Sequence, residues 1–127
     1  MFRISKEFHF SASHQLIGLA DGHPCARLHG HNYIVYVELA AEELNAHGFV
    51  RDYRDLDAFK TYLDNTVDHR HLNDVFGDHL TTAEYLAKQF YDWCTERWPE
   101  VCAVMVSETP KTKAEYRPAQ ISLCTTR

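Results

Sequence analysis

Apolar and polar residues alternate at the start of the chain. Apart from Lys6, every second side chain in residues 2–10 is apolar, and this period of two predicts a strand with one buried face. Residues 31–40 are rich in β-branched and aromatic side chains and predict a long second strand. The stretch 18–24 combines glycine, aspartate, histidine and proline, which is typical of a loop.

The spacing changes from strand-like to helical after position 53. A short strand is predicted at 49–53. Leu56, Phe59 and Leu63 then recur at helical intervals, which predicts a helix over about 54–65.

A second helix is predicted after a loop at residues 67–77. Thr81 and Glu84 fit the capping box, with Thr81 as the N-cap residue and Glu84 reaching back to it. The helix continues to about Trp98, and Pro99 follows its end.

Two more strands complete the pattern. They are predicted at 101–108 and 115–124, with Pro118 indicating an edge or a bulge. The order β-β-α-α-β-β predicts an α+β domain, a four-stranded antiparallel sheet with two helices on one face. A chain of 127 residues and 14.8 kDa fits a single domain over 1–127.

Composition and charge exclude several classes of protein. Apolar residues make up 45% and charged residues 24%, which argues against wholesale disorder. No uncharged stretch approaches the roughly 20 residues of a transmembrane helix, and no secretory signal pattern is visible. With a net charge of −5 and no basic stripe, we expect neither a nucleic acid nor a membrane as partner, whereas a small phosphorylated ligand is compatible.

The four cysteines form no CxxC pair, and we interpret them as reduced thiols of a cytoplasmic protein. Cys94, Cys102 and Cys124 lie in apolar periodic segments and are predicted to be small core residues. Cys25 lies in a predicted loop and is the thiol to consider for chemistry.

Histidine is over-represented, with nine residues against five lysines. His29 and His31 are two apart on a predicted strand, so both imidazoles point to the same face. Many surface strands carry such a pair, but His14 stands at the exit of the first strand, which could pair with this one. Three neutral imidazoles with an open fourth position are typical of a catalytic zinc site.

Two further segments could complete a reactive site. Cys25 lies four residues before His29 and could bind the metal, act beside it as a base or nucleophile, or have no task. Asp68 could orient His69 and raise its basicity, although adjacent residues rarely form that bond cleanly.

Glu108 ends an apolar strand, where a carboxylate needs a partner or its pKa rises. A guanidinium or amidine group of a ligand would be one such partner. The alternative is a salt bridge to Lys111 or Arg117.

Six segments in a fixed order resemble the 6-pyruvoyltetrahydropterin synthase superfamily, and more closely its bacterial 6-carboxytetrahydropterin synthase branch. The three residues between Cys25 and His29 resemble that branch. The resemblance implies the tunnelling fold, which agrees with the predicted order of elements. The segments are FHFSASH, CARLHGHN, GFVRDYRDLDAFK, VDHRHLND, TTAEYLA and VMVSETPKTKAEYR.

The resemblance also implies a role for each candidate residue. Cys25 would be the catalytic proton acceptor, with His69, oriented by Asp68, as its acid–base partner. Glu108 would anchor the pterin's 2-amino-pyrimidinone edge and belong to the catalytic charge relay. The zinc ligands would be His14, His29 and His31.

The implied reaction converts 7,8-dihydroneopterin triphosphate to 6-carboxytetrahydropterin, acetaldehyde and triphosphate, a step of queuosine biosynthesis. We also assign Thr82 and Arg27 to substrate binding, with Arg70, Lys111 and Arg117 as further candidates for the triphosphate. Members of the family form homo-oligomers, commonly hexamers, with active sites at subunit interfaces.

Two alternatives stay open. One is a pterin synthase that eliminates triphosphate without releasing acetaldehyde. The other is a non-catalytic, zinc-stabilised binding module whose site a protein ligand such as Cys25 closes. No role follows for the remaining histidines, His9, His23, His47, His71 and His79.

Overall fold

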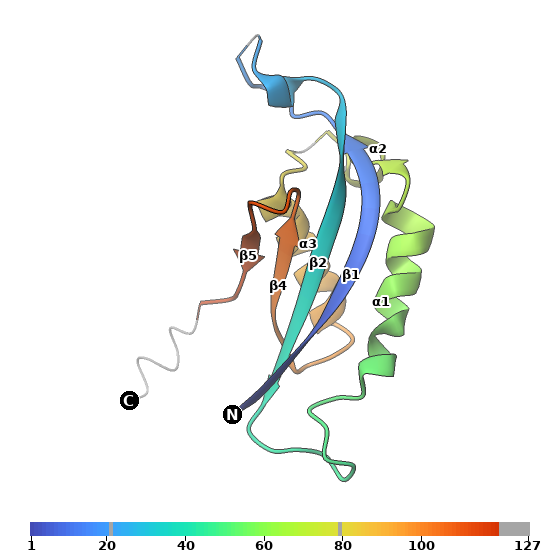
Figure 1. The fold of residues 1–127 in the computed structure, drawn as a ribbon, viewed down its shortest axis with the longest axis vertical. Helices are drawn as coiled ribbons and strands as arrows, with labels where there is room; N and C mark the ends of the chain where they lie inside the picture. The colour runs from blue at the N-terminus through green and yellow to red at the C-terminus, as the bar shows by residue number, and fades with distance from the viewer. Residues whose placement is uncertain (21, 79, 120–127) are drawn as a thin grey trace.

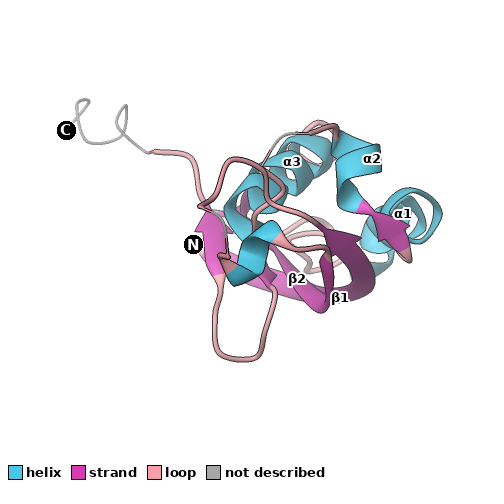
Figure 2. Ribbon diagram, turned by 90° about the horizontal axis from the view of Figure 1, so that it is seen from above, coloured by secondary structure: helices cyan, strands magenta, loops and turns pink. Residues whose placement is uncertain are grey.

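One mixed β-sheet, covered by helices on a single face, forms the protein. The computed structural model describes residues 1–20, 22–78 and 80–119. Two long antiparallel strands, β1 (Phe2–His14) and β2 (His29–Ala41), run along the molecule (Figure 1). The helices α1 (Asp57–Tyr62), α2 (Leu72–Phe76) and α3 (Ala83–Thr95) lie together on one side of them (Figure 2). The sequence-based α+β prediction is therefore confirmed.

The other strands join this pair on both sides, in the order β3-β1-β2-β4-β5. Strands β4 (Val101–Ser107) and β5 (Ala114–Tyr116) extend the sheet antiparallel to β2. The two-residue β3 (Arg70–His71) pairs parallel to β1. The sheet is thus mixed and five-stranded, whereas the sequence predicted an antiparallel sheet of four strands. The prediction missed β3 because two polar residues are too few to show an alternating pattern.

The helical elements are η1 (Pro24–Ala26), η2 (Tyr53–Leu56), α1 (Asp57–Tyr62), the π-helical η3 (Leu63–Val67), α2 (Leu72–Phe76) and α3 (Ala83–Thr95). The first helix predicted by the spacing corresponds to η2, α1 and η3 in succession. The predicted loop at 67–77 contains β3 and α2.

The strand predicted at 49–53 is wrong. The Asn45 side chain accepts hydrogen bonds from the backbone N–H groups of His47 and Phe49, at 2.9 and 3.0 Å. The Asn45 N–H also donates to the Phe49 carbonyl, so the segment closes on itself as a loop.

The predicted N-cap is off by one residue. Thr82 caps α3, since its Oγ1 accepts from the Tyr85 N–H at 3.1 Å, whereas Thr81 is fully buried. The helix ends at Thr95, short of the predicted end. Of the strand predicted at 115–124, only the start is in β5, residues 117–119 have no regular structure, and the rest lies outside the described residues.

The hydrophobic core fills the space between the sheet and the helices. Phe10 stacks on its cross-strand partner Tyr33, with ring centroids 4.6 Å apart. Phe90 of α3 packs edge-on against Phe10 and Phe59, with centroids 5.7 and 5.5 Å apart. The sheet face that continues this core toward the ends of β1 and β2 carries the candidate metal ligands.

We expect Phe90→Ala to lower the free energy of unfolding by about 3–5 kcal/mol, because it leaves a cavity among buried aromatic rings. Phe49→Ala is the matched control, since Phe49 is 45% exposed, and it should cost no more than about 0.5 kcal/mol. Urea unfolding followed by circular dichroism measures both. Equal losses in the two variants would contradict this account of the core.

Candidate active site

The strand pairing brings three histidines to one point. His14, the last residue of β1, lies opposite His29, the first residue of β2. His31 follows two residues later and therefore shares the face of His29. One ring nitrogen from each histidine lies within 4.8 Å of those of the other two. The predicted cluster is therefore present in the fold.

Backbone carbonyls fix the tautomers of two of these rings. His14 Nδ1 donates to the Thr81 carbonyl and His29 Nδ1 to the Arg27 carbonyl, both at 2.7 Å. In the neutral rings both Nε2 atoms then carry lone pairs, yet they lie only 2.9 Å apart. Two facing lone pairs repel unless a proton or a cation lies between them. A histidine that donates its Nδ1–H to a backbone carbonyl and leaves Nε2 free is typical of metal-binding sites.

Burial favours the neutral, metal-binding form of the rings. Desolvation is the largest effect on the pKa of His14 and of His31, and both values are lowered. His31 Nε2 is buried without a hydrogen-bond partner among the described residues. The Nε2 separation of 2.9 Å is slightly shorter than the about 3.3 Å expected between ligands of a tetrahedral zinc ion. These residues therefore fit a metal ion.

Glu108 stands beside this cluster, immediately after β4. Its Oε2 lies 3.0 Å from His31 Nε2, too poorly aligned for a hydrogen bond, and 4.0 Å from His14 Nε2. Arg117 pairs instead with Glu38 at 2.7 Å and with Glu115 at 3.2 Å. Within the described residues, the ion-pair contacts of Glu108 are thus with the histidines, not with the basic side chains considered from the sequence.

Asp68 and His69 form the bond that adjacent residues rarely make. His69 Nδ1 lies 2.8 Å from Asp68 Oδ2, and His69 has a φ of +58°, which is uncommon for a residue other than glycine. The backbone of Ser11 holds the pair on β1: its N–H donates to Asp68 Oδ1 at 2.8 Å and its carbonyl accepts from the His69 N–H at 2.6 Å.

Asp68 carries its charge at neutral pH, and the His69 ring beside it is accessible. The Ser11 N–H bond and then the His69 bond hold the pKa of Asp68 below its ordinary value. The His69 side chain is 81% exposed. An ionised carboxylate on one ring nitrogen and an accessible ring suit an acid–base group.

Cys25 lies in η1, in the connection between β1 and β2, and is half-buried. Its N–H donates to His23 Nδ1, which caps η1, and its carbonyl accepts from the Leu16 N–H. No hydrogen bond among the described residues joins its thiol to the three histidines or to His69. Within one chain, Cys25 and His69 are therefore not hydrogen-bonded partners.

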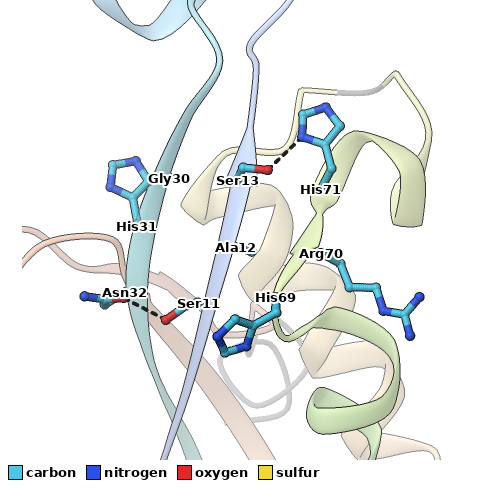
Figure 3. A pocket seen from close by; sticks show the side chains of 9 residues that line it. All are labelled: Ser11, Ala12, Ser13, Gly30, His31, Asn32, His69, Arg70 and His71. Atoms are coloured by element: carbon cyan, nitrogen blue, oxygen red, sulfur yellow. Dashed lines mark hydrogen bonds between the residues drawn. The ribbon is translucent and has the colours of Figure 1, made fainter.

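A cavity of about 410 Å³ lies near the paired strands and β3. Ser11 bonds to Asn32 across its wall, and Ser13 to His71, at 2.7 and 3.0 Å (Figure 3). The Arg70 side chain points away from the other labelled residues (Figure 3). The cavity is lined by Ser11, Ala12, Ser13, Gly30, His31, Asn32, His69, Arg70 and His71.

Other candidates from the sequence have structural partners. Cys94 is a core residue as predicted, whereas the Cys102 prediction is wrong, because this thiol is half-buried and bonds to Glu38 at 3.0 Å. His9 pairs with Glu7 at 2.6 Å on the exposed face. Cys124 and His79 lie outside the described residues.

Comparison of the sequence with known proteins identifies the family of this chain. The sequence matches the family described as 6-pyruvoyl tetrahydropterin synthase over residues 3–119. The chain belongs to this family. It is 34% identical to 6-carboxy-5,6,7,8-tetrahydropterin synthase of Bacillus subtilis (strain 168), over 92% of this chain and 86% of that protein. The synthase of the same name from Synechocystis sp. is also 34% identical, over 96% and 98%.

Solved structures of the family share its fold. The 6-pyruvoyl tetrahydropterin synthase of Caenorhabditis elegans superposes with a TM-score of 0.82 at 27% identity, covering 93% of this chain and 96% of that one. The Plasmodium falciparum enzyme gives 0.73 at 17% identity, over 92% and 97%, a likeness of fold alone. The tunnelling fold predicted from the sequence is thereby confirmed. In the described part of the chain, no helix has the length and apolarity needed to cross a membrane.

Proposed function

We propose that this protein is a zinc-dependent 6-carboxy-5,6,7,8-tetrahydropterin synthase. It would convert 7,8-dihydroneopterin triphosphate to 6-carboxytetrahydropterin, acetaldehyde and triphosphate in queuosine biosynthesis. The convergence of His14, His29 and His31 beside Glu108 supports this proposal most strongly. Its second support is the name shared by two relatives that align over nearly the whole chain.

The proposed chemistry divides among the residues already described. Zinc, which suits three imidazole ligands, would act as a Lewis acid that acidifies the side-chain hydroxyls of the substrate. Cys25 accepts a proton as a thiolate, and His69 returns or relays one while Asp68 holds its ring. Glu108 anchors the pterin ring so that the reacting carbons meet these groups.

We further propose that the protein works as a homo-oligomer, with a hexamer favoured and active sites at subunit interfaces. The lack of a described hydrogen bond between Cys25 and His69 within one chain supports this, because a second subunit could supply the partner group. Of the proposed substrate contacts, Arg27 remains exposed, whereas Thr82 caps α3. The paired state of Arg117 makes it the least available triphosphate contact.

Product analysis tests the proposed reaction. Purified protein loaded with Zn²⁺ is incubated with 7,8-dihydroneopterin triphosphate, and the products are identified by mass. Release of acetaldehyde together with 6-carboxytetrahydropterin supports the lyase. Triphosphate without acetaldehyde would indicate the eliminating pterin synthase instead. No turnover, together with unfolding on chelation, would indicate the zinc-stabilised binding module.

Asp68→Asn should lower kcat by about 10²-fold or more, the scale of general acid–base catalysis. The amide oxygen can still accept from the Ser11 N–H, but the charge that steadies the His69 ring is lost. Glu7→Gln is the matched control, because Glu7 pairs with the exposed His9 on the same strand. If the two variants had equal turnover, Asp68 would have no role in proton transfer.

The same variant should show a stability difference that depends on pH. Because folding lowers the pKa of Asp68, the carboxylate stabilises the fold above its unfolded pKa of about 3.9. That contribution is lost as the pH falls through the lower folded pKa. The free energies of unfolding of wild type and Asp68→Asn, measured with urea, should therefore differ at pH 7, and the difference should shrink as the pH falls below about 3.9. A difference that stays constant with pH would contradict the assignment.

A further inference from the structure

A buried tyrosine next to the three histidines has a hydroxyl without a partner. Tyr33 is fully buried, and among the described residues nothing hydrogen-bonds to its Oη. Buried tyrosine hydroxyls usually find a partner, since an unpaired one costs free energy that phenylalanine would avoid. The Tyr33 hydroxyl is therefore a candidate hydrogen-bond donor for an acceptor that comes within reach when a metal ion binds the three histidines.

Tyr33 lies between the core residue Phe10, on which it stacks, and two histidines of the candidate active site. Its ring packs edge-on against His31 and His14, with centroids 5.4 and 6.3 Å apart. Ile34 pairs with Ser107 at the last position of the β2–β4 ladder. Tyr33 precedes Ile34 on β2, and Glu108 follows Ser107 just after the end of β4. By the alternation of side chains, both belong to the face of the core.

Glu108 cannot serve both the metal and the substrate from its present position. Its Oε2 lies 3.0 Å from His31 Nε2 and 4.0 Å from His14 Nε2. A carboxylate this close to the converging ligand atoms would add a fourth protein ligand, which is typical of a closed structural site. To anchor a pterin, the carboxylate has to be held aside by another group.

We propose that Tyr33 is a positioning residue whose hydroxyl donates a hydrogen bond to the Glu108 carboxylate and holds it away from the metal. The proposal rests on the proposed function, in which Glu108 binds the pterin. A tyrosine phenol keeps its proton at neutral pH and can therefore donate this bond. The bond would form when a metal takes the histidine nitrogens and Glu108 leaves His31.

Tyr33→Phe tests this by removing the oxygen and keeping the ring. Glu108 is then free to enter the coordination sphere, so Co²⁺ should bind about tenfold more tightly or better, the scale of changes around a metal site. The visible Co²⁺ spectrum should change, the KM for the pterin substrate should rise more than kcat falls, and the melting temperature should not decrease. Tyr36→Phe, on the other face of β2, is the matched control and should change none of these.

The Glu108→Gln background separates positioning from a merely structural role. If Tyr33 acts through Glu108, adding Tyr33→Phe to Glu108→Gln should leave Co²⁺ affinity and spectrum unchanged. Unchanged or weaker binding in the single variant, or the same gain in both backgrounds, would overturn the proposal. Should Tyr33→Phe not fold, Glu108→Gln alone decides: a changed Co²⁺ spectrum would mean that Glu108 already binds the metal.

Neither metal measurement requires turnover. A failed product assay would therefore reject the proposed reaction, whereas the Co²⁺ affinities and spectra would still show whether Tyr33 keeps Glu108 away from the metal. Conversely, if the wild type releases acetaldehyde and Tyr33→Phe changes neither Co²⁺ affinity nor the Co²⁺ spectrum, only the role of Tyr33 is rejected.

Discussion

His29→Ala should bind metal far more weakly than wild type and lose the activity that depends on it. The variant removes one of three converging ligands, so the affinity for Zn²⁺ should fall by more than the roughly 10–100-fold that an outer-shell change costs. The fold should persist, because His29 is only half-buried and lies at a strand end. Metal content after dialysis, calorimetric titration and product formation measure these effects.

His9→Ala is the control for that experiment. His9 lies on β1 and is exposed, with Glu7 as its partner, so its loss should leave metal content and turnover unchanged. Should His29→Ala retain stoichiometric zinc and full turnover, the three-histidine site would not be the metal centre.

Cys25→Ala should keep its metal and lose most of its turnover. No described contact links the thiol to the three histidines, so zinc content should match wild type. Loss of the proton acceptor should lower kcat by about 10²–10⁴-fold. Product formation by mass spectrometry and metal analysis of the same sample provide the two readouts.

Cys102→Ala controls for removal of a half-buried thiol, since Cys102 bonds to Glu38 away from the histidines. Full turnover of Cys25→Ala would disprove the thiolate role. Loss of zinc from it would make Cys25 a ligand and would favour the binding module.

The sequence could predict those features of the site that depend on strand period. His29 and His31 share a face because side chains alternate, and His14 joins them because both strands extend to the connection between them. The core face followed from the same alternation. Exposed and buried positions along β1 agree with it from Phe8 to His14.

What the sequence could not predict depends on backbone groups and on short elements. The backbone carbonyls of Thr81 and Arg27 set the tautomers of His14 and His29. Every residue has a backbone carbonyl, so the residue types could not indicate these bonds. The sequence offered the Asp68–His69 bond as one possibility, but not the positive φ of His69 that accompanies it, which is uncommon outside glycine. Ser11 holds that pair through its main chain, so no side-chain pattern could have found it.

The pairing of His14 with His29 places two of the three proposed metal ligands at the end of one hairpin. These residues form the last rung of β1 and β2 before the chain leaves the sheet, and strand ends open locally far more often than a core does. Opening this single rung would separate His14 from His29 while the aromatic core stays closed. Exchange of bound metal should therefore follow the fraying rate of this rung and proceed without global unfolding, so stiffening the 15–28 connection would slow both loading and release.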